Sequence, residues 1–269
     1  MHIRTRNLTA LPLALVALGF ASASLAQSGG DKPQSAPAVP RLADGHPDLS
    51  GTWTGNLGNV FVVPGLRRSG AFEADQSAMQ RAAQWNKPMY KPEFWPKVRS
   101  LDYGRVEDDP FYGCYKPLGV PRQNMPVRIV QKAGQIWLFN NVENALRILP
   151  LDGRQRDQND YQFSTRNGMG LARWEGDTLV VESVGFGDNT WLGWEGYFHT
   201  DKMEVTERFL RVGDLLYYNF TVTDPDVLAE PWTSYTYVRR NNPNPARQDE
   251  APECSERDID LLADPFLRG

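Results

Sequence analysis

Hydrophobic and polar positions in the second half of the chain alternate with the period of a β-strand. Three pairs of alternating segments are each joined by a short turn that contains glycine: 127–132 with 135–140, 170–174 with 178–184, and 203–212 with 215–223. Glycine supplies the positive φ of a tight hairpin, and β-branched and aromatic residues flank each turn. A last strand is predicted over 232–239. This pattern predicts a mainly β fold, an antiparallel meander closed as a barrel, with a two-sheet β-sandwich as the alternative.

Two other patterns precede the hairpins. Residues 73–86, EADQSAMQRAAQWN, carry Ala, Met and Trp at helical spacing and predict one substantial helix. Proline then recurs every few residues from 87 to 123, a density that excludes both a helix and a central strand. We therefore predict a long, irregular, aromatic-rich lid over 87–123.

The N-terminus has the pattern of a secretory signal peptide. A short basic head, an apolar run ending at Leu25 and small residues before the junction predict cleavage after Ala26. The alternative, a retained anchor helix, is disfavoured because the run is short and contains a proline. Residues 27–44, rich in Pro, Gly, Ser and Ala, are predicted to be a disordered tether, and 45–269 a single β-barrel domain. The mature protein is then periplasmic or secreted, and not an integral membrane protein after cleavage.

Composition limits the classes of molecule that the protein is expected to bind. The formal net charge is −4, and Lys and Arg form no long run, so a nucleic-acid partner is not expected. The chain has 8 Trp and 10 Tyr, which suits a protein that binds a hydrophobic or aromatic small molecule.

Cys114 and Cys254 are the only cysteines. In a protein bound for an oxidising compartment, an even number of cysteines favours a disulfide bond between them. The alternative is that Cys114 is a thiol nucleophile assisted by His199.

The segment from Met203 to Arg211 carries the first candidate for chemistry. Alternation places Met203, Val205, Glu207 and Phe209 on one face, which we expect to be the inner face because it is apolar. A buried carboxylate either finds a partner or has a raised pKa. Glu207 is therefore either a structural ion pair with Arg173, Arg211 or Arg239, or a general acid or base that faces a ligand.

His199 precedes this strand and is the second candidate. An imidazole near an aromatic run can transfer protons near neutral pH, although a hydrogen-bonded loop histidine is the alternative. Arg208 could stabilise an oxyanion, and Glu182 is a reserve carboxylate. The predicted catalytic residues are His199, Glu207, Arg208 and Glu182, and the predicted substrate-binding residues are Trp191, Trp194, Tyr197, Phe209 and Tyr218.

Motifs for other chemistries are missing. There is no dinucleotide-binding glycine fingerprint, no P-loop and no Gly-x-Ser-x-Gly elbow, and two histidines beyond the signal peptide do not build an ordinary metal site. We therefore predict no cofactor and no metal. The preferred hypothesis is a cofactor-independent lyase, isomerase or cyclase that uses acid/base chemistry; the alternative is a non-catalytic periplasmic small-molecule carrier or sensor.

Two resemblances support export and a β-barrel. The block Arg173-Trp-Glu-Gly-Asp-Thr-Leu-Val-Val181, with segments around Cys114 and His199, resembles a large uncharacterised family of exported bacterial proteins. That resemblance implies export and one β domain but no reaction. In the family a histidine is expected directly after the second cysteine, whereas Ser255 follows Cys254 here. In addition, Gly51-Thr-Trp53 is similar to the Gly-x-Trp motif of lipocalin-like (calycin) barrels, which implies a lipocalin-like outline.

Overall fold

The computed structural model describes residues 38–54, 59–60, 86–101, 108–109, 118–123, 125–140, 145–162, 164–193 and 196–243. The chain divides into two compact units, Met1–Ser35 and Ala36–Gly269, and all described residues belong to the second. Several predictions lie outside the described residues: the signal peptide, Trp194, the pairing of Cys114 with Cys254, and the helix over 73–86 except for Asn86, which is not helical.

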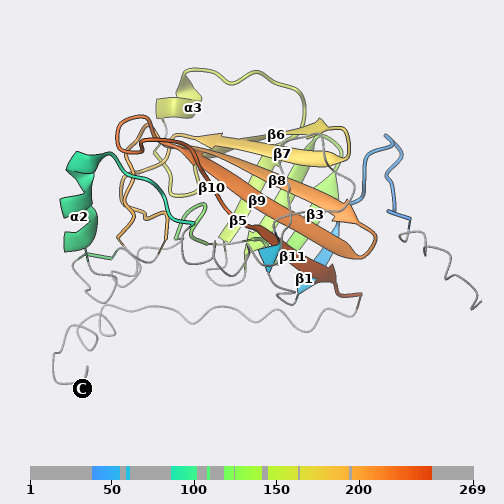
Figure 1. The fold of residues 1–269 in the computed structure, drawn as a ribbon. Helices are drawn as coiled ribbons and strands as arrows, with labels where there is room; N and C mark the ends of the chain where they lie inside the picture. Colours follow the sequence, from blue (N-terminus) through green and yellow to red (C-terminus); the bar gives the residue numbers. More distant parts are fainter. Residues whose placement is uncertain are drawn as a thin grey trace, which may run out of the picture. The chain divides into compact units, whose positions relative to one another are not determined.

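The second unit is a nearly closed antiparallel barrel, which confirms the predicted fold class (Figure 1). Hydrogen-bonded neighbours follow the order β5-β4-β3-β1-β11-β9-β8-β7-β6, which is the order of an up-and-down meander around a closed ring. The long strands are β3 (Arg128–Lys132), β4 (Gln135–Asn140), β5 (Ala145–Pro150), β6 (Met169–Glu175), β7 (Thr178–Val184), β8 (Glu204–Val212), β9 (Leu215–Thr223) and β11 (Thr236–Asn241). The short strands are β1 (Gly51–Thr54), β2 (Asn59–Val60) and β10 (Trp232–Thr233).

The short strand β1 joins the two halves of the sheet. Its first half pairs with β3, where Gly51 lies opposite Ile129, and its second half pairs with β11, where Trp53 lies opposite Asn241. The Trp53 ring is fully buried, and the Arg211 guanidinium lies 5.2 Å from its centroid. Arg211 also donates to the backbone oxygen atoms of Asp48 and Gly213, so this cation, the indole and the chain before β1 together fill the barrel beside the β8–β9 turn.

The ring of backbone pairing is interrupted between β5 and β6. Side chains bridge this junction: Arg147 on β5 reaches past β6 to Ser183 on β7, with 3.1 Å between Nη2 and Oγ. A Cβ at Gly170 would lie 2.5 Å from Leu149 Cδ2, so glycine at this position lets β5 lie close to β6. We call this junction the β5–β6 seam.

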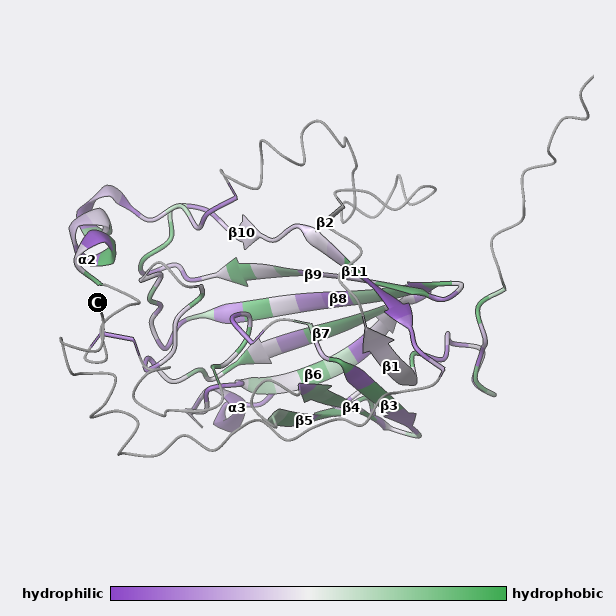
Figure 2. Cartoon of the chain, turned by 90° about the horizontal axis from the view of Figure 1, so that it is seen from below, coloured by the Kyte–Doolittle hydropathy of each residue, from purple (hydrophilic) through white to green (hydrophobic). Residues whose placement is uncertain are grey.

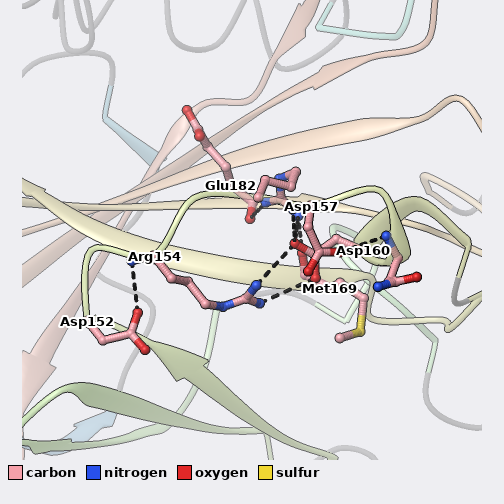
Figure 3. A network of polar contacts seen from close by, with 8 residues as sticks. Asp152, Arg154, Asp157, Asp160, Met169 and Glu182 are labelled. Carbon is pink, nitrogen blue, oxygen red and sulfur yellow. Dashed lines mark hydrogen bonds and ion pairs between the residues drawn. The ribbon is translucent and has the colours of Figure 1, made fainter.

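The connection from β5 to β6 covers the edge of β6 (Figure 3). It contains α3 (Asn159–Gln162), and Arg156 donates to the carbonyl oxygens of Met169 and Glu182. Arg154 binds the buried Asp160 carboxylate; burial alone would raise the pKa of Asp160, but the hydrogen bonds and the cations lower it. The Met169 carbonyl group on the edge strand β6 therefore has a donor from within the protein.

The interior is packed with side chains from the inward positions of the strands, where hydrophobic and polar residues alternate along each ribbon (Figure 2). Fully buried members include Trp53, Ile129, Ile136, Leu179, Phe209, Leu216 and Tyr218. The predicted hairpin segments 135–140, 178–184 and 215–223 match the observed strands residue for residue. The predicted last strand is divided into β10 and β11, and β5 was not predicted.

The prediction that proline excludes a helix from 87–123 is wrong. The segment contains a 3-10 turn, η1 (Pro92–Phe94), followed by α2 (Trp95–Ser100), with Pro92 and Pro96 in their first turns. Proline is tolerated there because the first N–H groups of a helix have no intrahelical acceptor. Both elements are short, with 3 residues in η1 and 6 in α2. Among the described residues, no helix has the length and apolar character needed to cross a membrane.

Part of the predicted tether belongs to the folded domain. Arg41 binds the Asp177 carboxylate through two hydrogen bonds, and the Asp48 N–H donates to the carbonyl of Pro40. The His46 ring stacks on Trp174 with 4.7 Å between centroids. Residues 38–44 are thus ordered by contacts with the β6–β7 hairpin that composition alone does not indicate, while residues 27–37 lie outside the described residues.

Gly196 provides a test of how α2 is held. Its φ is +72°, and a Cβ there would lie 2.9 Å from the Val98 oxygen and 2.7 Å from Leu101 Cβ. We expect Gly196→Ala to lower the free energy of unfolding by about 2–4 kcal/mol, from left-handed strain plus overpacking. Gly134→Ala is the matched control, since Gly134 has a φ of +73° and open space around it. Urea unfolding should show a loss of only about 1–2 kcal/mol there; equal losses would contradict the packing contact.

Candidate functional site

The inner face of β8 carries the site. Val205, Glu207 and Phe209 are almost fully buried, and the intervening Thr206 and Arg208 are not, as alternation predicts. Glu207 keeps 1% of its surface exposed. A carboxylate at this position needs a counter-charge, because an isolated buried charge is costly.

The counter-charge of Glu207 is Arg147. Its Nη2 lies 2.6 Å from Glu207 Oε2, and both side chains are buried. The ion pair therefore joins β5 to β8 across the barrel, next to the contact of Arg147 with Ser183. The structure places none of Arg173, Arg211 or Arg239, the partners suggested by the sequence, against this carboxylate.

The two oxygens of Glu207 have different surroundings. Tyr218 donates to Oε1 at 3.1 Å, and burial followed by the nearby Glu207 charge holds the pKa of this phenol well above its usual value. Tyr218 is therefore a stable donor. Oε2 is buried beside Arg147, yet no N–H of the described residues is aligned on it well enough for a hydrogen bond. One oxygen of the pair can thus accept a further donor.

A small pocket adjoins the Arg147 side of this cluster. It is lined by Gln123, Pro126, Leu138, Asn140, Ala145 and Arg147, and its volume of about 10 Å³ is the space of one water molecule. Asn140 Nδ2 donates to the backbone oxygen of Gln123. The Gln123 side-chain oxygen is buried and has no hydrogen-bond partner in the part of the chain that the structure describes. The pocket therefore holds polar atoms that a small polar group could satisfy.

Arg239 brings a second guanidinium to the same region. It lies on β11 opposite Leu216, and its Nη1 is 3.5 Å from the carbonyl oxygen of Pro126, a residue that lines the pocket. Burial lowers the pKa of Arg239, and no carboxylate forms an ion pair with it among the described residues. The polar cluster, defined as Gln123, Arg147, Glu207, Tyr218 and Arg239, therefore contains two cations and one anion.

An aromatic row begins at this cluster. The ring centroid of Tyr218 lies 6.0 Å from that of Tyr237 and 6.3 Å from that of Phe220, and Phe220 lies 5.1 Å from Trp232. Tyr237 and Trp232 are only partly buried, unlike Tyr218 and Phe220. The row gives an apolar or aromatic molecule surfaces to contact beside the charged groups.

His199 belongs to a different set of contacts. Its Nδ1 lies 2.9 Å from the carbonyl oxygen of Thr200, which can only accept, so Nδ1 carries the proton and the neutral ring accepts from Thr190 through Nε2 at 2.6 Å. The ring is 3% exposed, and burial lowers its pKa despite the hydrogen bond to Thr200. Both ring nitrogens are engaged, which is the loop-histidine alternative rather than a group free to exchange protons.

The other predicted catalytic residues lie on the outer face of the barrel. Arg208 binds Glu175 with 2.7 Å between Nη1 and Oε2, and Glu182 binds Arg173 at 2.8 Å. Both pairs are partly exposed. Alternation places them on the opposite face of their strands from Glu207 and Ser183, so neither side chain shares the interior with the polar cluster.

The predicted binding residues are mostly core residues. Trp191, Tyr197 and Phe209 are buried, and Phe209 packs against Tyr218 at 4.9 Å between centroids. Trp191 also lies under Arg122, whose guanidinium forms a bidentate ion pair with Asp109 at 2.6 Å. Of this set, Tyr218 alone forms a hydrogen bond with Glu207 among the described residues.

A larger groove lies outside the polar cluster. It has a volume of about 510 Å³ and is lined by Lys202, Glu204, Thr223, Asp224, Pro225, Leu228, Ala229, Glu230 and Pro231. Most of these residues are exposed. The buried Asp224 carboxylate already accepts from the Thr200 N–H and hydroxyl. The groove is thus roomy, but its only buried carboxylate has partners, and we favour the polar cluster as the candidate site.

No protein-family model, no curated protein and no solved structure matches this chain.

Arg147 and Gln123 are the site residues that sequence reasoning missed. The signal for Arg147 was the segment Ala145-Leu-Arg-Ile-Leu-Pro150, in which a cation stands between apolar neighbours at strand spacing. If the segment is taken as a strand, Arg147 shares a face with Ala145 and Leu149, which are buried. No comparable signal marks Gln123, which lies in a turn.

The buried pair can be tested by removing its cation. Arg147→Met leaves Glu207 buried without a counter-charge, and we expect a loss of about 3–5 kcal/mol in the free energy of unfolding measured in urea. Arg208→Met is the matched control, because Arg208 binds Glu175 on the partly exposed outer face; it should cost only about 0–1 kcal/mol. The double variant Arg147→Met/Glu207→Leu should recover much of the loss. Equal losses from the two single variants would show that burial of the pair has no special importance.

The lowered pKa of His199 predicts that the free energy of unfolding depends on pH. Its pKa is lowered from 6.5 in the folded protein, so the unfolded chain takes up the proton first. The neutral ring's contribution is complete above about pH 6.5 and is lost as pH falls below it, by at most about 1.4 kcal/mol per pH unit. Urea unfolding from about pH 7.5 to about pH 5 should therefore show a steeper fall for the wild type than for His199→Gln. His46 is common to both proteins, and parallel curves would contradict the assignment.

Proposed function

We propose that this protein binds a small organic acid with an apolar or aromatic body at the polar cluster, as a non-catalytic carrier or sensor. The observation that carries the proposal is the imbalance of charge: among the described residues, Arg147 and Arg239 are accompanied by the single carboxylate of Glu207. An uncompensated partly buried cation is costly, and a ligand carboxylate would offset that cost.

The small pocket limits how the ligand fits. Its space suits a polar head group that replaces a bound water, not a whole drug-sized molecule. The body of the ligand then lies against Tyr237 and Trp232, the members of the aromatic row that keep exposed surface. Gln123 Oε1 offers an acceptor to any hydroxyl near the head group.

Acid/base catalysis is the second candidate. The hydrogen bond from Tyr218 and the free accepting position on Glu207 Oε2 favour it, since a carboxylate with an available oxygen can receive a proton. His199 does not support this candidate, because both of its ring nitrogens are already bonded. A lyase or isomerase would have to rely on Glu207 and Tyr218 alone.

The proposal also includes the compartment in which the protein acts. The N-terminal pattern supports export, and an exported carrier would act in the periplasm or outside the cell. A disulfide between Cys114 and Cys254 is part of that proposal, since it would form in the same compartment.

The ligand class can be tested with matched acids and amides. Benzoate and cyclohexanecarboxylate should raise the melting temperature, whereas benzamide and cyclohexanecarboxamide, which have the same shape but no charge, should not. A ligand at 100 times its dissociation constant adds about 2.7 kcal/mol to the free energy of unfolding. Arg239→Met should abolish the shift.

The neighbouring Arg240→Met is the control, since it removes the same charge from an exposed residue paired with Asp214. Equal stabilisation by acids and amides, or equal effects of the two variants, would overturn the proposed ligand class. Conversion of a ligand to a product, lost in Glu207→Gln, would favour the catalytic candidate instead.

A further inference from the structure

The outer face of β3, β4 and β5 carries a regular array of side chains. The register aligns Arg128 with Phe139 and Leu146, then Val130 with Trp137 and Ile148, and finally Lys132 with Gln135 and Pro150. Residues directly opposite each other on paired strands share a face, so these nine side chains form one surface, here called the β3–β5 face. Six of the nine are apolar, and β4 and β5 are green over much of their length in Figure 2.

The exposure of this face is unusual. Leu146 and Ile148 keep 44% and 52% of their surface exposed, and they are two of the four large exposed hydrophobic residues of the described chain. Their strand is inverted in polarity, because Arg147 points inward between them. Large apolar side chains grouped at the surface mark a site that contacts something other than water.

The charges of the face have one sign. Arg128 and Lys132 stand on β3 at its border, and none of its nine residues is a carboxylate. The Lys132 Nζ lies 3.8 Å from the centroid of the Trp137 ring, which keeps the ammonium beside the apolar surface. The charged members of these nine residues are both cations, and an apolar surface with cations beside it complements an apolar phase covered by negative charge.

The area of the β3–β5 face favours a lipid surface over a second copy of the chain as its binding partner. Three strands of five residues span roughly 14 by 17 Å, or about 240 Å², whereas a stable dimer buries about 800 Å² on each partner. A second copy would also bring the same cations together in a two-fold interface. A lipid surface has no such minimum area, since a few side chains can insert on their own.

We propose that the β3–β5 face binds anionic lipid bilayers peripherally, with Leu146 and Ile148 entering the interface and Arg128 and Lys132 contacting lipid phosphates. Trp137, whose Nε1 is buried, lies opposite Ile148 and supports this apolar surface from β4. The inference is independent of the proposed ligand, because the face lies outside the barrel and the polar cluster inside it.

Co-sedimentation of the full chain with vesicles tests the proposal. The wild type should bind an equal mixture of phosphatidylglycerol and phosphatidylcholine, less so as salt is raised, and bind pure phosphatidylcholine poorly. Arg128→Gln/Lys132→Gln should reduce the partition coefficient on anionic vesicles about 25-fold, at about fivefold per cation. Leu146→Ser/Ile148→Ser should reduce it at least about tenfold.

The control is Met89→Ser/Tyr161→Ser, which removes the other two exposed hydrophobic residues, at 50% and 55% exposure, and should leave binding unchanged. Because all variants carry the same N-terminal apolar run, its own affinity for lipid cancels in the comparison. Unchanged binding in the two β3–β5 variants would overturn the proposal, as would a loss in Arg128→Gln/Lys132→Gln that is equally large on neutral vesicles. A dimer in sedimentation velocity that the Leu146→Ser/Ile148→Ser change dissociates would assign the face to a second copy instead.

Discussion

Closure of the barrel depends on side chains at the junction between β5 and β6, which the described backbone does not join by a hydrogen-bonded ladder. At the β5–β6 seam, Arg147 extends inward and reaches Ser183 and Glu207, while Leu149 packs over Gly170. Elsewhere around the ring, neighbouring strands are joined by regular antiparallel pairing. Closure of the barrel therefore rests on a charged contact and a glycine, and the strand that carries the charge also determines what lies on both faces of the sheet.

The inward direction of Arg147 explains the chemistry of the interior. A guanidinium that crosses the barrel at this point requires a carboxylate, and Glu207 supplies it from β8. Glu207 is thus a structural counter-ion first, and its capacity to accept a further donor follows from imperfect alignment with Arg147. Arg239 then stands near the same pocket without a described carboxylate, which is why we favour an acidic ligand over a proton-transfer reaction.

The inward direction of Arg147 also determines which side chains of β5 lie on the outer face. With Arg147 inside, the period of β5 turns Leu146 and Ile148 to the surface, next to Trp137 and Phe139 of β4. The closure of the seam and the apolar β3–β5 face are two results of one register. A shift by a single residue would bury the leucine and isoleucine and expose the arginine, and it would remove both features together.

Local features of the sequence were sufficient to predict most strands of the sheet. Three hairpins were predicted because alternation and turn glycines are short-range signals, and burial along β8 placed Glu207 inside as the pattern implied. The strand β5 was missed because a cation interrupts its apolar run. The helix α2 was excluded wrongly, since its prolines stand in the first turn, where no hydrogen bond is lost.

By itself, the sequence determined the fold class, the main hairpins and the face on which each strand residue lies. Only the tertiary structure decided that Arg147 is the partner of Glu207, that His199 is engaged at both nitrogens, and that Arg208 and Glu182 belong to exposed pairs. The physical reason is that periodicity records whether a side chain points inward or outward, which is a property of one strand. The identity of the group it meets depends on the register and closure of strands distant in the chain, and no local pattern specifies these.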